Sequence, residues 1–295
     1  MDLIIKDLCK TYPNGVKAID SLNLKIGKGM FGLLGPNGAG KSSLMRTIAT
    51  LQDPDSGSMH FGETDILNDP MSLRRVLGYL PQEFGVYPKM NADELLDYFA
   101  TLKGVASKKD RNKIVEYVLE LTNLTDVRKK HVSSYSGGMK QRFGIAQLLL
   151  NNPKLIIVDE PTAGLDPAER NRFLNVLRGI ASSNTIIFST HIVDDIKDLC
   201  NDMAIMNNGR ILKQASPVSA TRDIEGKIFV RDIEPSQLTE MELTHNILST
   251  KYNSDNSLKI RIFADSKPAE DFYIEDPVLE DVYFIALQEV NKLKQ

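Results

Sequence analysis

The chain has 295 residues, of which 42% are apolar and 25% charged, close to the usage of ordinary soluble proteins. This composition argues against a disordered, collagen-like or coiled-coil protein and allows one large domain or two modest ones. The 36 basic and 39 acidic side chains leave a net charge of −3, so no overall positive field favours binding to nucleic acid or an anionic membrane.

A membrane-spanning helix is not expected. The longest run without Asp, Glu, Lys or Arg covers residues 179–193, and spanning needs about 18 or more predominantly apolar residues. Asp2 and Lys6 interrupt the first residues before a secretory apolar segment could form. The two cysteines, Cys9 and Cys200, are too few for a disulfide framework and too far apart for a metal motif. We therefore expect a cytoplasmic protein.

The first two thirds of the chain alternate short strands with helices. Apolar residues three or four positions apart predict helices, and short apolar or alternating runs predict strands. Fully apolar runs such as residues 155–158 are typical of strands buried on both faces of a parallel sheet. The expected strands are residues 22–26, 30–34, 58–61, 76–80, 155–158 and 185–188, and the expected helices are residues 41–51, 91–120 and 167–180.

Strands separated by helices predict an α/β fold with a mostly parallel sheet. We expect residues 1–215 to form this first domain, with an N-terminal antiparallel β subdomain and a helical insert at about 86–150. Beyond residue 216 the pattern changes, and residues 216–295 are predicted to form a small α+β C-terminal domain. The elements expected there are strands at 227–230 and 258–262 and a last amphipathic helix after Asp276-Pro277.

A glycine-rich loop follows the strand at 30–34 and begins the next helix. Residues 35–42 read G-P-N-G-A-G-K-S, which fits the phosphate-binding pattern G-x-x-x-x-G-K-[ST] in its required strand–loop–helix context. Backbone N–H groups of such a loop surround a phosphate at the helix N-terminus. Lys41 is expected to bridge the β- and γ-phosphates and Ser42 to bind Mg²⁺, which predicts a P-loop NTPase core. The predicted nucleotide-binding residues here are Gly35, Pro36, Asn37, Gly38, Ala39, Gly40, Lys41, Ser42 and Ser43.

Two acidic residues, Asp159 and Glu160, directly follow the apolar run at 155–158. The carboxyl end of a parallel strand is where open α/β sheets carry their sites. Successive strand residues point to opposite sides, so the two acids can act differently. Asp159 is placed to hold Mg²⁺, and Glu160 to orient and polarise the water that attacks the γ-phosphate.

A second candidate anion site lies at Ser136, Gly137 and Gly138, where a serine and two glycines begin a predicted helix. A hydroxyl and free backbone N–H groups at a helix N-terminus face outward and attract negative charge. Alone, this pattern fits a plain helix cap equally well.

Together these motifs resemble those of the ATP-binding subunits of ATP-binding cassette (ABC) transporters. Residues 135–142, Y-S-G-G-M-K-Q-R, are similar to the signature sequence of that family, although Tyr135 and Met139 replace its usual Leu and Gln. The resemblance covers residues 1–215, and the motifs follow the order known for the family.

The resemblance implies roles for further residues. Gln82 matches a glutamine that touches Mg²⁺ and the attacking water, and His191 matches a switch histidine that contacts the γ-phosphate. The segment Ala163-Gly164-Leu165-Asp166 is similar to a loop that runs along a dimer interface, and Tyr12 matches an aromatic residue that stacks on adenine.

For function, the resemblance implies a subunit that binds and hydrolyses ATP with Mg²⁺ and drives a separate membrane permease. Two copies, or this chain and a paralogue, would dimerise head to tail, so that Ser136 and Gly138 of one close on the γ-phosphate held by the other. The permease would hold the protein at the cytoplasmic face of the cell membrane, without nucleic acid as a partner.

Two questions stay open at the level of sequence. Residues 276–283, D-P-V-L-E-D-V-Y, resemble an ending of exporter subunits that serve drug, antibiotic-peptide or polysaccharide permeases, which favours export, but they also fit ordinary core packing. The alternative function is a soluble, non-transport ABC ATPase that acts on ribosomes or DNA. A single phosphate loop and no heptad run argue against that alternative.

Overall fold

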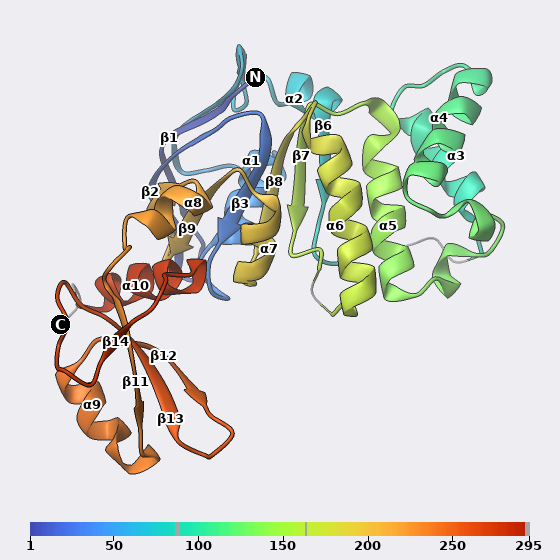
Figure 1. Cartoon of the computed structure of the whole chain (residues 1–295). Coiled ribbons are helices and arrows are strands. Elements are labelled where there is room, and N and C mark those ends of the chain that lie inside the picture. The colour runs from blue at the N-terminus through green and yellow to red at the C-terminus, as the bar shows by residue number, and fades with distance from the viewer. Residues whose placement is uncertain (86–88, 163, 293–295) are drawn as a thin grey trace.

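A six-stranded sheet forms the centre of the molecule in the computed structural model, which describes residues 1–85, 89–162 and 164–292 and side chains as far as residue 289 (Figure 1). The inner strands run parallel, and the edge strand β10 pairs antiparallel with β9. The order across the sheet is β10(Arg210–Ala215), β9(Asp202–Asn207), β3(Gly29–Leu34), β8(Thr185–Thr190), β7(Leu155–Asp159) and β6(Leu77–Leu80).

The central strands are apolar because both faces of the sheet are covered. Every residue of β7 and β8 is buried. In β3, Met30 and Leu34 belong to the apolar cluster on one face, and Phe31 and Leu33 belong to the cluster on the other. Helices α6(Pro167–Ala181) and α7(Val193–Leu199) pack in the first cluster, and α1(Lys41–Ile48) packs in the second.

A four-stranded antiparallel sheet packs on the side of α1 that faces away from the six-stranded sheet. Its strand order is β2(Lys17–Ile26), β1(Leu3–Thr11), β4(Ser56–Phe61) and β5(Thr64–Asp65), and α2(Pro70–Val76) leads from it to β6. The alternation of buried and exposed residues in β2 places Leu22, Leu24 and Ile26 in the cluster around α1. This arrangement fixes the loop between β3 and α1 at the meeting point of both sheets.

Three helices with an apolar cluster of their own lie beside β6 (Figure 1): α3(Ala92–Leu102), α4(Lys108–Leu121) and α5(Gly137–Leu148). The sequence predicted one helix over residues 91–120, and this was wrong: the chain breaks after α3, where Gly104 has φ +89°, a conformation that favours glycine. The predicted start was right, because Asn91 caps α3 and forms a reciprocal capping box with Glu94.

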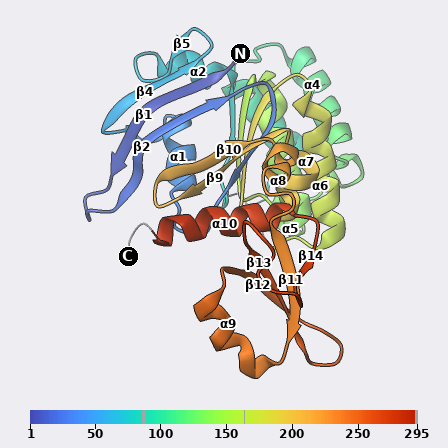
Figure 2. The ribbon, with the colours of Figure 1, turned by 60° about the vertical axis from the view of Figure 1, so that its left-hand side comes forward.

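A second antiparallel sheet lies in the C-terminal part, in the order β12(Ile247–Tyr252), β13(Leu258–Phe263), β11(Ile228–Ile233) and β14(Tyr273–Ile274). It forms an apolar cluster with α9(Leu238–Thr244). In Figure 2, α10(Leu279–Lys292) lies between this sheet and the first 215 residues. Both α10 and α8(Pro217–Arg222) contribute side chains to the main apolar cluster, among them Ala220, Val282 and Ala286. The domain boundary at residue 216 stays a prediction.

These observations confirm the predicted fold class. The mostly parallel sheet, the N-terminal antiparallel sheet, the helices inserted between β6 and β7 and the C-terminal α+β segment are all present. Among the described residues, no helix is both long enough and apolar enough to cross a membrane.

Candidate active site

A cleft of about 700 Å³ lies where the phosphate loop, β1 and the carboxyl ends of the parallel strands meet. It collects residues that are distant in sequence, including Tyr12, Lys41, Gln82, Glu160 and His191. The remaining lining residues are Val16, Lys17, Ala18, Asn37, Gly38, Ala39, Gly40, Ser42, Ser43 and Asn208. Eleven of these lining residues are predicted site residues, so most of the predicted site lies in one cleft.

The phosphate loop requires glycine at two close approaches. Gly40 has φ +105°, and a Cβ atom there would collide with the Ala18 carbonyl oxygen. A Cβ atom at Gly35 would collide with the carbonyl oxygen of Met206 on β9. No side chain caps the N-terminus of α1, so its free N–H groups and the positive end of the helix dipole suit an anion.

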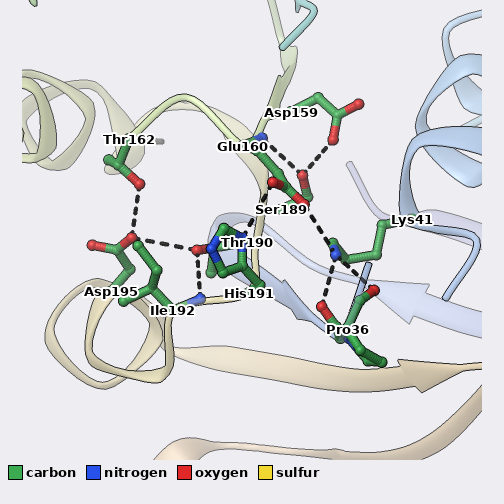
Figure 3. Close-up of polar contacts among 11 residues, drawn as sticks. Pro36, Lys41, Asp159, Glu160, Thr162, Ser189, Thr190, His191, Ile192 and Asp195 are labelled. Carbon is green, nitrogen blue, oxygen red and sulfur yellow. Dashed lines mark hydrogen bonds and ion pairs between the residues drawn. The ribbon is translucent and has the colours of Figure 1, made fainter. Parts of the chain in front are cut away.

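The ammonium group of Lys41 lies buried under this loop. Its Nζ donates to the carbonyl oxygens of Gly35 at 2.7 Å and Pro36 at 3.2 Å, and it forms an ion pair with Glu160 Oε1 at 3.1 Å (Figure 3). The side chain is only 4% exposed. The carbonyl contacts aim the charge at the loop, where nucleotide phosphates would compete with Glu160 for it.

Glu160 connects both sides of the site. Its Oε1 faces Lys41, and its Oε2 lies 3.2 Å from His191 Nδ1. The residue has φ +45°, a left-handed conformation that costs a non-glycine residue free energy. Its amide donates to the Ser189 carbonyl and hydroxyl oxygens at 3.2 and 3.0 Å, which holds this backbone in place.

Asp159 lies at the buried end of β7, and it does not line the cleft. The Ser189 hydroxyl donates to Asp159 Oδ1 at 2.6 Å while it accepts from the Glu160 amide (Figure 3). Ser189 on β8 therefore orients both acids. Sequence reasoning missed this role, because nothing in the sequence shows that residues 30 positions apart meet across β7 and β8.

Tyr12 and Gln82 both line the cleft. The Tyr12 hydroxyl lies 3.0 Å from Ser43 Oγ on α1 and donates to Gln52 Oε1 at 3.1 Å, so its ring is anchored at the wall. Gln82 is exposed just beyond β6. Asn208, in the turn between β9 and β10, also lines the cleft and was not predicted, although the Asn-Gly pair at 208–209 is a readable turn signal.

The signature residues lie outside the cleft of their own chain. Ser136 and Gly137 are exposed at the start of α5, and Ser136 Oγ accepts from the Met139 amide at 3.2 Å. Tyr135 turns inward: its ring packs edge-on against Phe143, and its hydroxyl donates to the Val127 carbonyl oxygen at 3.0 Å. The departure from the family pattern at Tyr135 is thus absorbed by the apolar cluster of the inserted helices, where Met139 also packs.

The remaining predicted residues lie near the start of α6. Asp166 caps this helix by accepting from the Glu169 amide at 2.9 Å. Gly138 packs against the side chain of Glu169, which also forms an ion pair with Arg142 of α5. The signature helix and α6 are therefore tied together within one chain. Ala163 lies outside the described residues.

Comparisons with known proteins decide the family. The sequence pattern of the ABC transporter family matches residues 19–163. YxlF of Bacillus subtilis (strain 168), an uncharacterized ABC transporter ATP-binding protein, is 38% identical over 210 residues, which cover 71% of this chain and 69% of its own. The chain belongs to the ABC transporter family.

Other members of the ABC transporter family show its range. DrrA of Streptomyces peucetius, a daunorubicin/doxorubicin resistance ATP-binding protein, is 33% identical over 71% of this chain and 63% of its own. MetN 2 of Oceanobacillus iheyensis, a methionine import ATP-binding protein, is 32% identical over 85% of this chain and 72% of its own.

A solved structure shows the same fold around hydrolysis products. The dimeric, post-hydrolysis structure of the ATP-binding cassette MJ0796, bound to ADP and Pi, matches with a TM-score of 0.66 and 25% identity, over 72% of this chain and 98% of that chain. With the phosphate loop and Glu160 in one cleft, this ABC protein is an ATPase.

Proposed function

We propose that this chain is the ATP-hydrolysing subunit of an exporter, which dimerises around ATP and drives a separate membrane permease. The observation that carries the proposal is the split arrangement of its anion-binding groups. Lys41, Glu160 and His191 share the cleft, whereas Ser136 and Gly137 are exposed outside it. A second chain, turned head to tail, would complete each site with its own Ser136, Gly137 and Gly138.

Within one site, the chain's own residues divide the work. The phosphate loop and Lys41 would bind the β- and γ-phosphates of ATP, so that Lys41 exchanges its contact with Glu160 for phosphate oxygens. The freed Glu160 carboxylate would orient the attacking water. His191 lies 3.2 Å from Glu160 and is 44% exposed, which leaves its ring open to a γ-phosphate entering the cleft. Tyr12 would carry the adenine.

The residues present fit Mg²⁺. Ser42, Gln82 and Asp159 offer hydroxyl, amide and carboxylate oxygens, the ligands that this ion prefers. Among the described residues, no group of three or more His, Cys, Asp and Glu side chains is placed to hold a metal, so phosphate oxygens and water would complete the coordination. When bound, Mg²⁺ would supply positive charge against the phosphates.

A permease partner would use the free energy of ATP binding and hydrolysis for transport. ATP would bind more tightly to the closed dimer than to the open one, and loss of the γ-phosphate would let the dimer open again. This cycle of closing and opening would do work on the permease bound to the dimer. The resistance function in DrrA's name and the ending at 276–283 support export. The similarity to MetN 2, an import protein by name, makes direction a separate test.

The experiment begins with purification of this chain from membranes and reconstitution with the membrane protein that copurifies. Both proteins are placed in lipid vesicles with this chain on the outer side, and Mg²⁺-ATP is added outside. Export predicts that cargo accumulates inside and that Glu160→Gln abolishes accumulation. Release of preloaded cargo would indicate import. A chain that binds no membrane protein, but cosediments with ribosomes or DNA, would contradict the proposal.

A further inference from the structure

One buried carboxylate near the active site takes no part in the chemistry described so far. Asp195 lies in the first turn of α7, four residues after His191, and its side chain is fully buried. It does not line the cleft. Burying a carboxylate lowers the stability of a protein unless hydrogen-bond donors surround it, so Asp195 needs such donors around it.

Three different segments supply the donors to Asp195. Arg170 on α6 donates from Nε to Oδ1 at 2.7 Å. Thr162, in the loop after β7, donates its hydroxyl to Oδ2 at 2.9 Å, and Thr190, at the end of β8, does so at 3.4 Å (Figure 3). One carboxylate thus joins segments that are up to 33 residues apart in the sequence.

These segments carry Glu160 and His191, which the proposed function, on which this inference rests, places at the γ-phosphate. Thr162 stands two residues after Glu160. Thr190 directly precedes His191, and its hydroxyl oxygen also accepts from the amide of Ile192 at 2.9 Å. In the view of Figure 3, Asp195 and Lys41 lie to opposite sides of Glu160 and His191, which contact one another.

We propose that Asp195 is a positioning residue for ATP hydrolysis, which holds the loop of Glu160 and the loop of His191 at a fixed separation. Arg170 extends the tie to α6, whose N-terminus carries Asp166. Geometry of this kind governs rate, because a misplacement of about 1 Å in a reacting group can cost about a hundredfold.

The alternative explanation is that Asp195 serves only to pack α7 against α6. A pair of variants separates the two. Arg170→Met leaves the Asp195 charge buried without its cation, so both thermal stability and kcat should fall. Adding Asp195→Leu removes that charge and should restore most of the melting temperature, while Leu, which has no polar atom, can bond neither Thr162 nor Thr190 and no longer joins the two loops.

The measurement is steady-state Mg²⁺-ATP hydrolysis by the full chain. In Arg170→Met/Asp195→Leu we expect kcat about tenfold below the parent, with KM and nucleotide affinity within about twofold, because the phosphate loop is untouched. A double variant that regains stability and also regains kcat would overturn the proposal. A double variant that unfolds and loses nucleotide binding would also overturn it, because the contacts of Asp195 would then serve to stabilise the fold and not to position Glu160 and His191.

Matched controls lie on the same two helices. Arg172 on α6 is 60% exposed and pairs only locally with Glu169, and Asp194 in the first turn of α7 is exposed. Arg172→Met and Asp194→Leu should keep the parental kcat and melting temperature. If they lower kcat as much as the double variant does, the effect is not specific to Asp195.

A second readout reports on His191 directly. The chain has four histidines, so their ring resonances can be counted by NMR, and His191→Gln identifies the one that disappears. The proposal predicts that this resonance shifts in the double variant and stays in place in both controls. An unmoved His191 resonance would show that Asp195 does not position the ring.

Discussion

At the scale of single residues, the site depends on hydrogen bonds that fix acidic side chains before ATP arrives. The clearest case is Ser189, which is fully buried and contacts Asp159 and Glu160 with one hydroxyl group. The donated bond orients the Asp159 carboxylate, and the accepted bond stabilises the unusual backbone of Glu160. Preorganisation of this sort lowers the cost of reaching the reactive geometry.

Replacing Ser189 by Ala removes both bonds while keeping the strand. We expect kcat for ATP hydrolysis to fall about tenfold and the free energy of unfolding to fall by about 1–2 kcal/mol. Nucleotide affinity should change little, because Lys41 and the phosphate loop are untouched. Ser182→Ala, at an exposed position before β8, is the control. Parental kcat in Ser189→Ala would refute the role given to this hydroxyl.

At the scale of elements, local sequence patterns predicted helices and strands well, whereas contacts between distant segments could not be predicted. The Asn91 cap, the glycines of the phosphate loop and the apolar runs of β7 and β8 act through near neighbours, so their pattern is visible in the sequence. The break at Gly104 was missed because apolar spacing continues across it. The donors to Asp195 come from separate segments, and only the packed sheet brings them together.

The helical insert offers a test with a defined pH dependence. Burial raises the pKa of Tyr135 to about 12, whereas an unfolded tyrosine titrates near 10. Between pH 10 and 12 the unfolded chain therefore loses a proton that the folded chain keeps, and the stability contributed by Tyr135 is lost as pH rises through this window.

Tyr135→Phe removes both the hydroxyl and its titration. At neutral pH this variant should be less stable than the parent by about 1 kcal/mol, since the bond to the Val127 carbonyl is gone. The difference in unfolding free energy should shrink above pH 10, while every other titrating group is common to both proteins. Denaturant unfolding at pH 7, 10 and 11 measures this difference in unfolding free energy. A difference that stays constant with pH would contradict the raised pKa of Tyr135.

At the scale of the whole molecule, α10 joins the C-terminal sheet to the ATPase core. Asp281 is 1% exposed in the first turn of α10 and accepts from Arg261 on β13 at 2.6 and 2.8 Å, as well as from the Val278 amide at 2.8 Å. Residues 276–283 thus have a structural role, in line with the core-packing interpretation of their sequence, although the pattern did not predict the ion pair with Arg261.

Breaking this ion pair should loosen the C-terminal part. Asp281→Ala removes the bonds of Arg261 to Asp281 but leaves its ion pair with Glu275, and we expect it to lower the free energy of unfolding by about 2 kcal/mol. Glu280→Ala, at the exposed neighbouring position, should have little effect. Hydrogen exchange followed by mass spectrometry should show faster exchange in β11 and β13 for Asp281→Ala only. Equal protection in both variants would contradict the role assigned to this pair.

The central claim concerns two such molecules: ATP lies between the phosphate loop of one chain and residues 136–138 of the other. The most direct test is the molar mass of Glu160→Gln with Mg²⁺-ATP, measured by light scattering during gel filtration. Gly137 is exposed, and an added Cβ there meets only Leu165, so Gly137→Glu alters this face without disturbing the fold. Ser133→Glu, exposed nearby, is its control. We predict a dimer for Glu160→Gln alone and with Ser133→Glu, and a monomer with Gly137→Glu. A dimer that persists with Gly137→Glu would contradict the account.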